Sequence, residues 1–84
     1  MWKPKFGDKV KINNKLKRIV EERRWNPDML KFIGSIGVVE RVGPLGVELD
    51  RYQYSKYPPG PTIEWFRWPI EALEPVKKKI IIFD

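Results

Sequence analysis

The stretch from Gly34 to Leu49, GSIGVVERVGPLGVEL, constrains the fold more than any other part of this 84-residue chain. Valines between positions 38 and 42 indicate one strand, and residues 47–50 alternate apolar with acidic side chains, the period of a half-buried strand. Residues 43–46, GPLG, lie between them and favour a turn, because glycine reaches positive φ and proline fixes φ at about −65°. The stretch therefore predicts a β-hairpin.

Other strands are expected to pair with this hairpin. Gly34 and Gly37 precede it, and glycine at the start of a strand indicates a bulge or a close approach of two backbones. Residues 9–12 predict the first strand of the chain, because Val10 and Ile12 alternate with two lysines. Its apolar side chains are expected in the core and its lysines on the opposite face.

A helical insertion over about residues 14–31 is expected between the first strand and the hairpin. Residues 15–24 combine an apolar face with oppositely charged side chains four positions apart, and Asn14 precedes them as a helix cap. Asn26, with proline and aspartate directly after it, predicts a second short helical turn. Three apolar side chains are then expected to enter the core: Met29, Phe32 and Ile33.

The stretch from residue 63 to residue 76 predicts one strand, one helical turn and a last short strand. Residues 63–68 have high β propensity, and as a strand they would place Trp65 and Trp68 on opposite faces. One of these two rings is therefore expected near the surface. Residues 69–73 predict a single helical turn of the 3₁₀ type, and residues 73–76 predict the closing strand.

Three motifs carry a resemblance to a known superfamily: Gly7-Asp8 before the first strand, Ile33–Val39 opening the second, and the close from Trp68-Pro69 to Leu73-Glu74-Pro75. Over residues 6–76 the pattern resembles the SH3-like barrels. The resemblance implies a mostly β fold, a small five-stranded SH3-like barrel over residues 1–76, with the helical insertion in its first long loop.

The pattern is similar to several members of that superfamily with different functions. Likeness to the mind-bomb-type repeats would imply peptide binding, and likeness to the barrel at the end of the nitrile hydratase β chain would imply a subunit interface. KOW and small archaeal chromatin barrels share the architecture and bind nucleic acid. Motifs made of turn and core residues specify a fold better than a function.

Composition excludes several classes of function. The chain has no histidine and no cysteine, so the commonest general base, the commonest metal ligand and any disulfide are absent. Its carboxylates are scattered and no glycine-rich phosphate loop precedes a helix, so we expect no enzyme, no metal and no cofactor. No apolar run approaches the length of a membrane span, and a cytoplasmic location is expected.

Net charge makes a nucleic acid, DNA or RNA, the first expected partner. The chain carries +6, with nine lysines and arginines against three acids in residues 1–24 and three against one in residues 77–84. Basic side chains neutralise phosphates and flat rings stack on bases. The candidate binding residues come from the basic N-terminal part and from stretches in which basic and aromatic side chains are interleaved: Lys17, Arg23, Arg24, Trp25, Tyr52, Tyr54, Lys56, Tyr57, Arg67 and Trp68.

A protein-interaction module is the alternative interpretation of the same residues. Tyrosines and Trp68 could line a groove for an extended or Pro-rich peptide, or for a partner subunit. The tail, KKKIIIFD at residues 77–84, is expected to add a strand to a sheet edge or to make a dimer contact. The expected oligomeric state is therefore a monomer or a weak homodimer through this tail.

Overall fold

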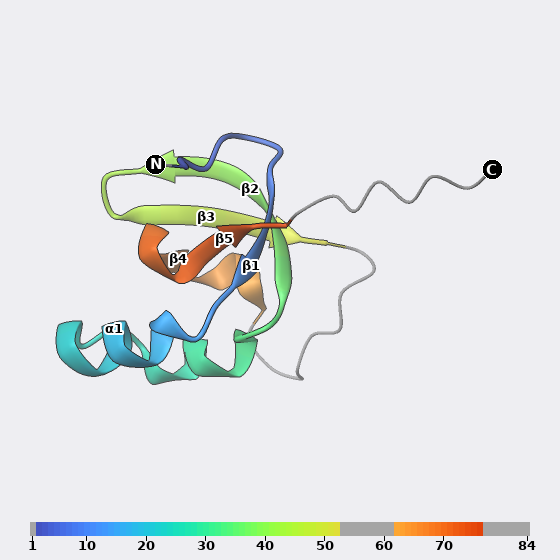
Figure 1. Ribbon diagram of the computed structural model, residues 1–84. Coiled ribbons are helices and arrows are strands. Elements are labelled where there is room, and N and C mark those ends of the chain that lie inside the picture. Colours follow the sequence, from blue (N-terminus) through green and yellow to red (C-terminus); the bar gives the residue numbers. More distant parts are fainter. Residues whose placement is uncertain (1, 53–61, 77–84) are drawn as a thin grey trace.

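The computed structural model describes residues 2–52 and 62–76, and its centre is one antiparallel sheet (Figure 1). Five strands lie in the order β4-β3-β2-β1-β5: β1 Lys9–Ile12, β2 Ile36–Gly43, β3 Gly46–Arg51, β4 Arg67–Trp68 and β5 Leu73–Pro75. The helices are α1, Lys15–Arg23, and three 3₁₀ turns, η1 Pro27–Phe32, η2 Ile63–Trp65 and η3 Ile70–Ala72. The mostly β class is confirmed. The predictions for Tyr54, Lys56, Tyr57 and the tail at 77–84 fall outside the described residues.

The predicted hairpin is confirmed as β2 and β3, which pair from Gly37 with Arg51 to Gly43 with Gly46. A bulge lies between Val39 and Arg41, and not at the glycines that precede the strand. The predicted close approach occurs at Gly37 and not at Gly34. A β-carbon on Gly37 would lie 3.2 Å from the Asp50 carbonyl oxygen and 3.1 Å from the Ile63 Cδ1 atom, so a larger residue would require these neighbours to shift, whereas a β-carbon on Gly34 would meet no atom within 4 Å.

Replacing Gly46 with alanine is expected to lower the free energy of unfolding by about 1–3 kcal/mol. Its φ of 134° is a glycine conformation, and an added β-carbon would lie 2.9 Å from the Trp68 carbonyl oxygen. Gly43→Ala is the matched control at the other end of the turn, because its β-carbon would meet its nearest neighbour at 3.8 Å. Urea unfolding of both variants measures the difference, and equal losses would contradict this account of Gly46.

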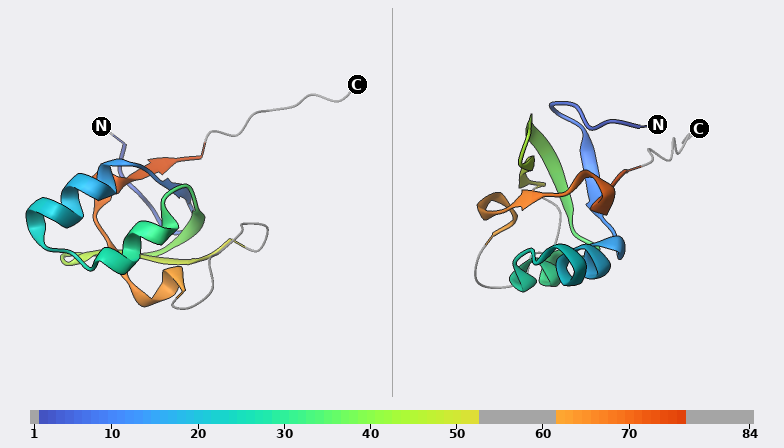
Figure 2. Two further views of the ribbon diagram at one scale, coloured as in Figure 1. Left: turned by 90° about the horizontal axis from the view of Figure 1, so that it is seen from below. Right: turned by 90° about the vertical axis from the view of Figure 1, so that its left-hand side faces the viewer.

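The helical insertion covers one end of the sheet. α1 lies beside η1 there (Figures 1 and 2), and it buries Leu16, Ile19 and Val20. Asn14 is the N-cap residue of α1, as predicted, but its side chain makes no capping hydrogen bond. The Asn13 Oδ1 atom instead accepts the Lys15 N–H at 3.0 Å. The η1 cap is confirmed, since Asn26 Oδ1 accepts the Asp28 N–H at 2.9 Å. Met29 and Phe32 are buried as predicted, and Ile33 is half-buried against the core.

The strand predicted over residues 63–68 is wrong in its first half. Residues 63–65 form the 3₁₀ turn η2, and only Arg67 and Trp68 form a strand. The physical reason is that Ile63 and Trp68 are both fully buried, which two positions five apart cannot be in one half-buried strand. The turn brings both side chains to the core, where the Trp68 indole N–H donates to the Ile63 carbonyl at 3.0 Å.

The sheet curves around the core but does not close into a barrel, so the predicted closed form is corrected. Among the described residues β4 pairs with β3, β5 pairs with β1, and no pairing joins β4 to β5. These two edge strands are two and three residues long and are connected through η3. Pro69 and Pro75 lack N–H groups, which removes donors from the segment that closure would require.

Candidate functional site

An open hollow lined by aromatic side chains lies on the solvent side of the sheet, and we call it the aromatic groove. Its volume is about 600 Å³, and its lining includes Trp2, Asp8, Lys9, Ile36, Tyr52 and Pro75. β1 sets its position, because Val10 and Ile12 are buried while Lys9 and Lys11 face the other way. Lys11 pairs with Ile36 across β1 and β2, and Tyr52 follows directly after β3, so the groove crosses three strands.

Lys9 and Tyr52 contact each other inside the aromatic groove. The lysine Nζ atom lies 4.7 Å from the centroid of the tyrosine ring and donates to the phenol oxygen at 3.4 Å. Tyr52 is half-buried, and a cation–π contact near the surface contributes about 0.5–1 kcal/mol. The contact fixes both a positive charge and a flat ring at the same place in the groove.

The N-terminal segment adds a second aromatic ring and further positive charge. Trp2 and Pro4 turn toward the protein, with Trp2 packed against the core and Pro4 buried, while Lys3 and Lys5 are exposed. Next to them, Phe6 is 81% exposed. Rings and lysines therefore alternate along one strip of chain that leads into β1.

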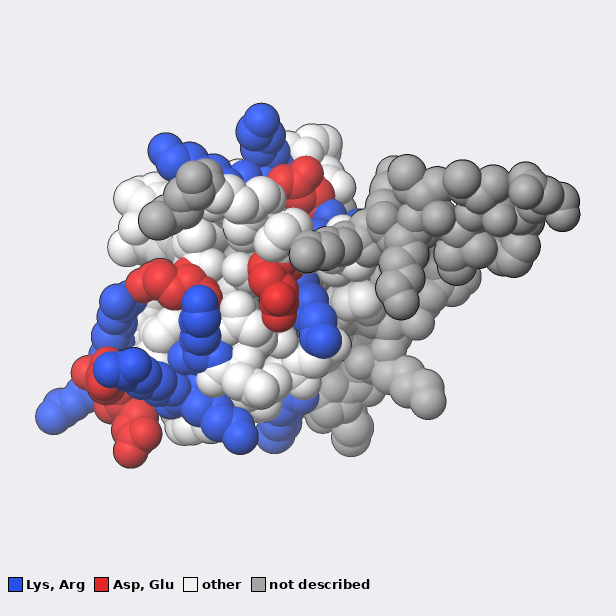
Figure 3. Space-filling model, in the orientation of Figure 1, with Lys and Arg blue, Asp and Glu red and all other residues white. Residues whose placement is uncertain are grey.

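The charges on the rest of the surface are mostly balanced. Within residues 2–52 and 62–76 every ion pair joins an arginine to a glutamate, as in Arg18 with Glu22 and Arg23 with Glu71. Figure 3 shows acidic and basic side chains interspersed over the α1 end of the molecule. No described lysine lies within ion-pair distance of a described carboxylate. Lys9 therefore brings a positive charge without a carboxylate partner into the groove.

The predicted arginine–tryptophan cluster lies at another place. Arg23 and Trp25 line a smaller hollow beside the β2–β3 turn, which also contains Leu45 and Ile70 and which we call the hairpin-tip hollow. It shares no lining residue with the aromatic groove. Lys17 lies away from both, since it precedes Arg23 by six positions and is turned by about 120° around the α1 axis.

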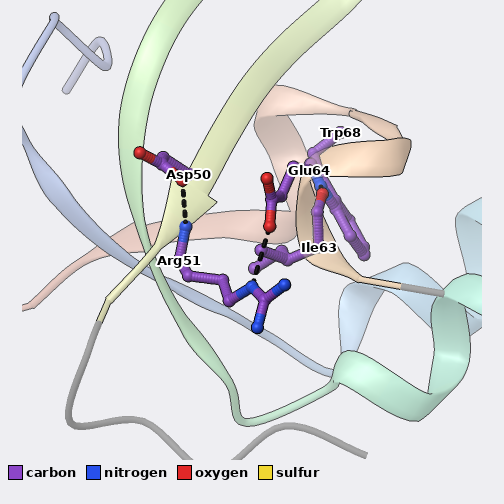
Figure 4. A network of polar contacts seen from close by, with 5 residues as sticks. All are labelled: Asp50, Arg51, Ile63, Glu64 and Trp68. Carbon is purple, nitrogen blue, oxygen red and sulfur yellow. Dashed lines mark hydrogen bonds and ion pairs between the residues drawn. The ribbon is translucent and has the colours of Figure 1, made fainter. Parts of the chain in front are cut away.

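The prediction that Trp68 contacts a binding partner is wrong. The Trp68 ring is fully buried, and it packs edge-on against Phe32 and Phe66 with centroids 5.8 and 5.7 Å apart. Figure 4 shows it beside Ile63, behind the surface residues of η2. The exposed ring of the predicted pair is Trp65, which is 74% exposed, and this confirms that one of the two tryptophans lies at the surface.

An ion pair lies at the surface beside this part of the core (Figure 4). Arg51 donates to Glu64 with an Nε–Oε1 distance of 2.7 Å, and this joins the end of β3 to η2. The hydrogen bond from Arg51 holds the pKa of Glu64 below its ordinary value. Arg51 is therefore engaged in the fold and contributes less positive charge to the surface than its type suggests.

A second ion pair stands at the edge of the hairpin-tip hollow. Arg23 Nη1 lies 2.7 Å from Glu71 Oε2 and joins α1 to η3. A hydrogen bond from its own backbone, followed by the one from Arg23, lowers the pKa of Glu71. A lowered carboxylate pKa contributes stability that is present at neutral pH and is lost only as the pH falls through the folded-state value.

The sequence named Tyr52 as a candidate binding residue, and Tyr52 lines the groove, but the candidates did not include two other lining residues, Trp2 and Lys9. A signal for Lys9 existed, because its alternation with Val10 already placed it on the outer face of the first strand. What joined it to Tyr52 was the pairing of β1 with β2 and of β2 with β3. That pairing connects residues 43 positions apart.

Two further features of the described residues concern metal binding and membrane insertion. Among these residues, no three metal-ligating side chains come together, and no helix is long and apolar enough to cross a membrane. The arrangement offers flat rings, positive charge and an open groove. Comparisons with protein-family models, with curated proteins and with solved structures give no match.

Proposed function

We propose that the protein is a small non-catalytic module that binds single-stranded nucleic acid, DNA or RNA, in the aromatic groove. The observation that carries the proposal is Lys9, which lines the groove together with the rings of Trp2 and Tyr52 and has no carboxylate partner among the described residues. Further lysines without such a partner lie nearby in the same stretch of chain, at positions 3, 5 and 11. Proteins that bind single strands combine a basic groove with rings on which bases stack.

The sheet supplies the support for this site. Lys9 and Lys11 project from β1, which is flanked by β2 and β5 and cannot shift without breaking both pairings. A site built on a paired strand is held more rigidly than one built on a loop. The strand order, in which the last strand returns beside the first, supports an open form of the SH3-like architecture.

Three carboxylates lie close to the lysines and limit the charge of the site. Glu74 is the cross-strand neighbour of Lys11, Asp50 pairs with Val38 beside Lys9, and Asp8 lines the groove. The net positive charge at the groove is therefore small. We expect modest affinity that depends strongly on the rings, and not the tight binding of a purely electrostatic surface.

Binding to a fluorescent oligo(dT) of about 12 nucleotides tests the proposal by anisotropy. With about four phosphate contacts, log K against log salt concentration should fall with a slope of about −3. Trp2→Ala and Tyr52→Ala should each weaken binding by about five- to tenfold, as the loss of one stacked base requires. Trp65→Ala, which removes an exposed ring away from the groove, is the matched control.

Two results would overturn the proposal. One is affinity for oligo(dT) that is the same in wild type and in the Trp2 and Tyr52 variants. The other is binding of a Pro-rich peptide in the same groove that hardly changes with salt while oligo(dT) does not bind, which would favour a protein-interaction module.

A further inference from the structure

The hairpin-tip hollow exposes aliphatic side chains that the nucleic-acid proposal does not use. Leu45 at the β2–β3 turn is 70% exposed, and Ile70 in η3 is 42% exposed. Both line the hollow together with Trp25, Pro44 and Pro69. These side chains come from three separate segments that the fold brings to one place, and they offer apolar contact area beside a hollow.

The size of the hollow selects the kind of ligand. Its volume is about 220 Å³, below the range of about 300–1,000 Å³ that is usual for small-molecule sites. That space suits one large side chain of a partner. Leu45 and Ile70 have no flat face on which a base could stack, whereas tryptophan and arginine beside aliphatic groups are typical of protein interfaces.

The charged residues around the hollow indicate the sign of the charge that a partner would carry. Arg23 is neutralised by Glu71, but Arg24 has no carboxylate partner among the described residues and is held at the end of α1 with φ of 54°. Arg67 lies next to the hollow, because its β-carbon would be 3.3 Å from one placed on Gly46. Arg24 stands in the chain between the lining residues Arg23 and Trp25, so it and Arg67 bring two positive charges to the neighbourhood of the hollow. Carboxylates of a partner would be attracted to them.

We propose that the hairpin-tip hollow docks a protein segment in which one large apolar side chain is flanked by carboxylates. The apolar side chain fills the space between Trp25, Leu45 and Ile70, and the carboxylates meet Arg24 and Arg67. β2 separates this surface from the aromatic groove by about 20 Å, from Gly43 at one end to Ile36 at the other. A nucleic acid and an acidic protein segment can therefore be bound together, and the protein connects them.

A phage-displayed library of random peptides of about nine residues tests the docking surface. Selection is made on immobilised wild-type protein with excess soluble Leu45→Glu variant as competitor. We expect enriched peptides to share an apolar residue between aspartates or glutamates. They should bind Leu45→Glu and Ile70→Glu at least tenfold more weakly than wild type, and Arg24→Glu several-fold more weakly.

Control measurements separate docking from folding and from nucleic-acid binding. Leu45 and Ile70 lie on different elements, so an unfolded variant at one position leaves the other as the test. Lys17→Glu, an exposed charge reversal on α1 outside the hollow, should bind the selected peptides as wild type does. Oligo(dT) binding should be unchanged in Leu45→Glu, so the failure of one proposal is distinguishable from the failure of the other.

The outcomes that overturn the inference are definite. If no peptide is enriched over the competitor, or if the enriched peptides are basic, the hollow does not take an acidic segment. Equal affinity of the enriched peptides for wild type, Leu45→Glu and Ile70→Glu would show that they bind elsewhere.

Discussion

Replacing Trp68 with alanine is expected to cost about 3–5 kcal/mol of the free energy of unfolding and to leave much of the protein unfolded at 37 °C. The ring is fully buried and contacts Phe32 and Phe66 edge-on, and its N–H satisfies the Ile63 carbonyl. Alanine would leave a cavity among these rings and a buried carbonyl without its donor. Domains have only about 5–15 kcal/mol of stability in total, and a small one is expected near the lower end.

Trp65→Ala is the matched control, because it removes the same side chain from the same short segment. With 74% of Trp65 exposed, the change should stay within about 0.5 kcal/mol. Urea unfolding followed by far-UV circular dichroism gives both values. If the Trp65 variant were as unstable as the Trp68 variant, the assignment of Trp68 to the core and of Trp65 to the surface would be contradicted.

Reversing the charges of Lys9 and Lys11 together is expected to weaken oligo(dT) binding by more than tenfold. The double variant Lys9→Glu/Lys11→Glu removes two of the proposed phosphate contacts and adds two repulsive charges on the outer face of β1. It also removes the cation from the Tyr52 ring, so that the ring loses part of its support. The slope of log K against log salt should decrease in magnitude by about 1.4, at about 0.7 for each lost contact.

Lys17→Glu/Lys31→Glu is the matched control for this experiment. It changes the net charge by the same amount at two exposed lysines on α1 and η1, neither of which lines the aromatic groove. Affinity should fall by no more than about threefold, the general effect of lower net charge. Equal losses in the two double variants would mean that total charge, and not the groove, determines binding, and the proposed site would then be wrong.

Much of the local structure followed from short-range chemistry. The GPLG turn with its flanking alternation predicted β2 and β3, and the cap at Asn26 predicted η1. These signals act within a few residues, through allowed φ values and the alternation of side chains. They identify an element but do not state which of its faces the rest of the chain will cover.

The sites depended on contacts that no local signal contains. Arg23, Trp25 and Tyr52 carry the same kind of sequence signal, yet the fold places the first two beside the β2–β3 turn and the third with Lys9 across the sheet. Three of the predicted tyrosine-loop residues lie outside the described part of the chain, so their predicted role stays a prediction.

The sequence by itself determined the strands other than the one predicted over residues 63–68, the helical insertion and the absence of histidine and cysteine chemistry, because these follow from residue type and spacing. Only the tertiary structure decided that Trp68 is inside and Trp65 outside, that the sheet stays open, and that Lys9 meets Tyr52. The physical reason is that burial is a property of the whole molecule. An aromatic ring is buried or exposed according to which distant segments of the chain pack over it, and these segments come together only when the strands pair.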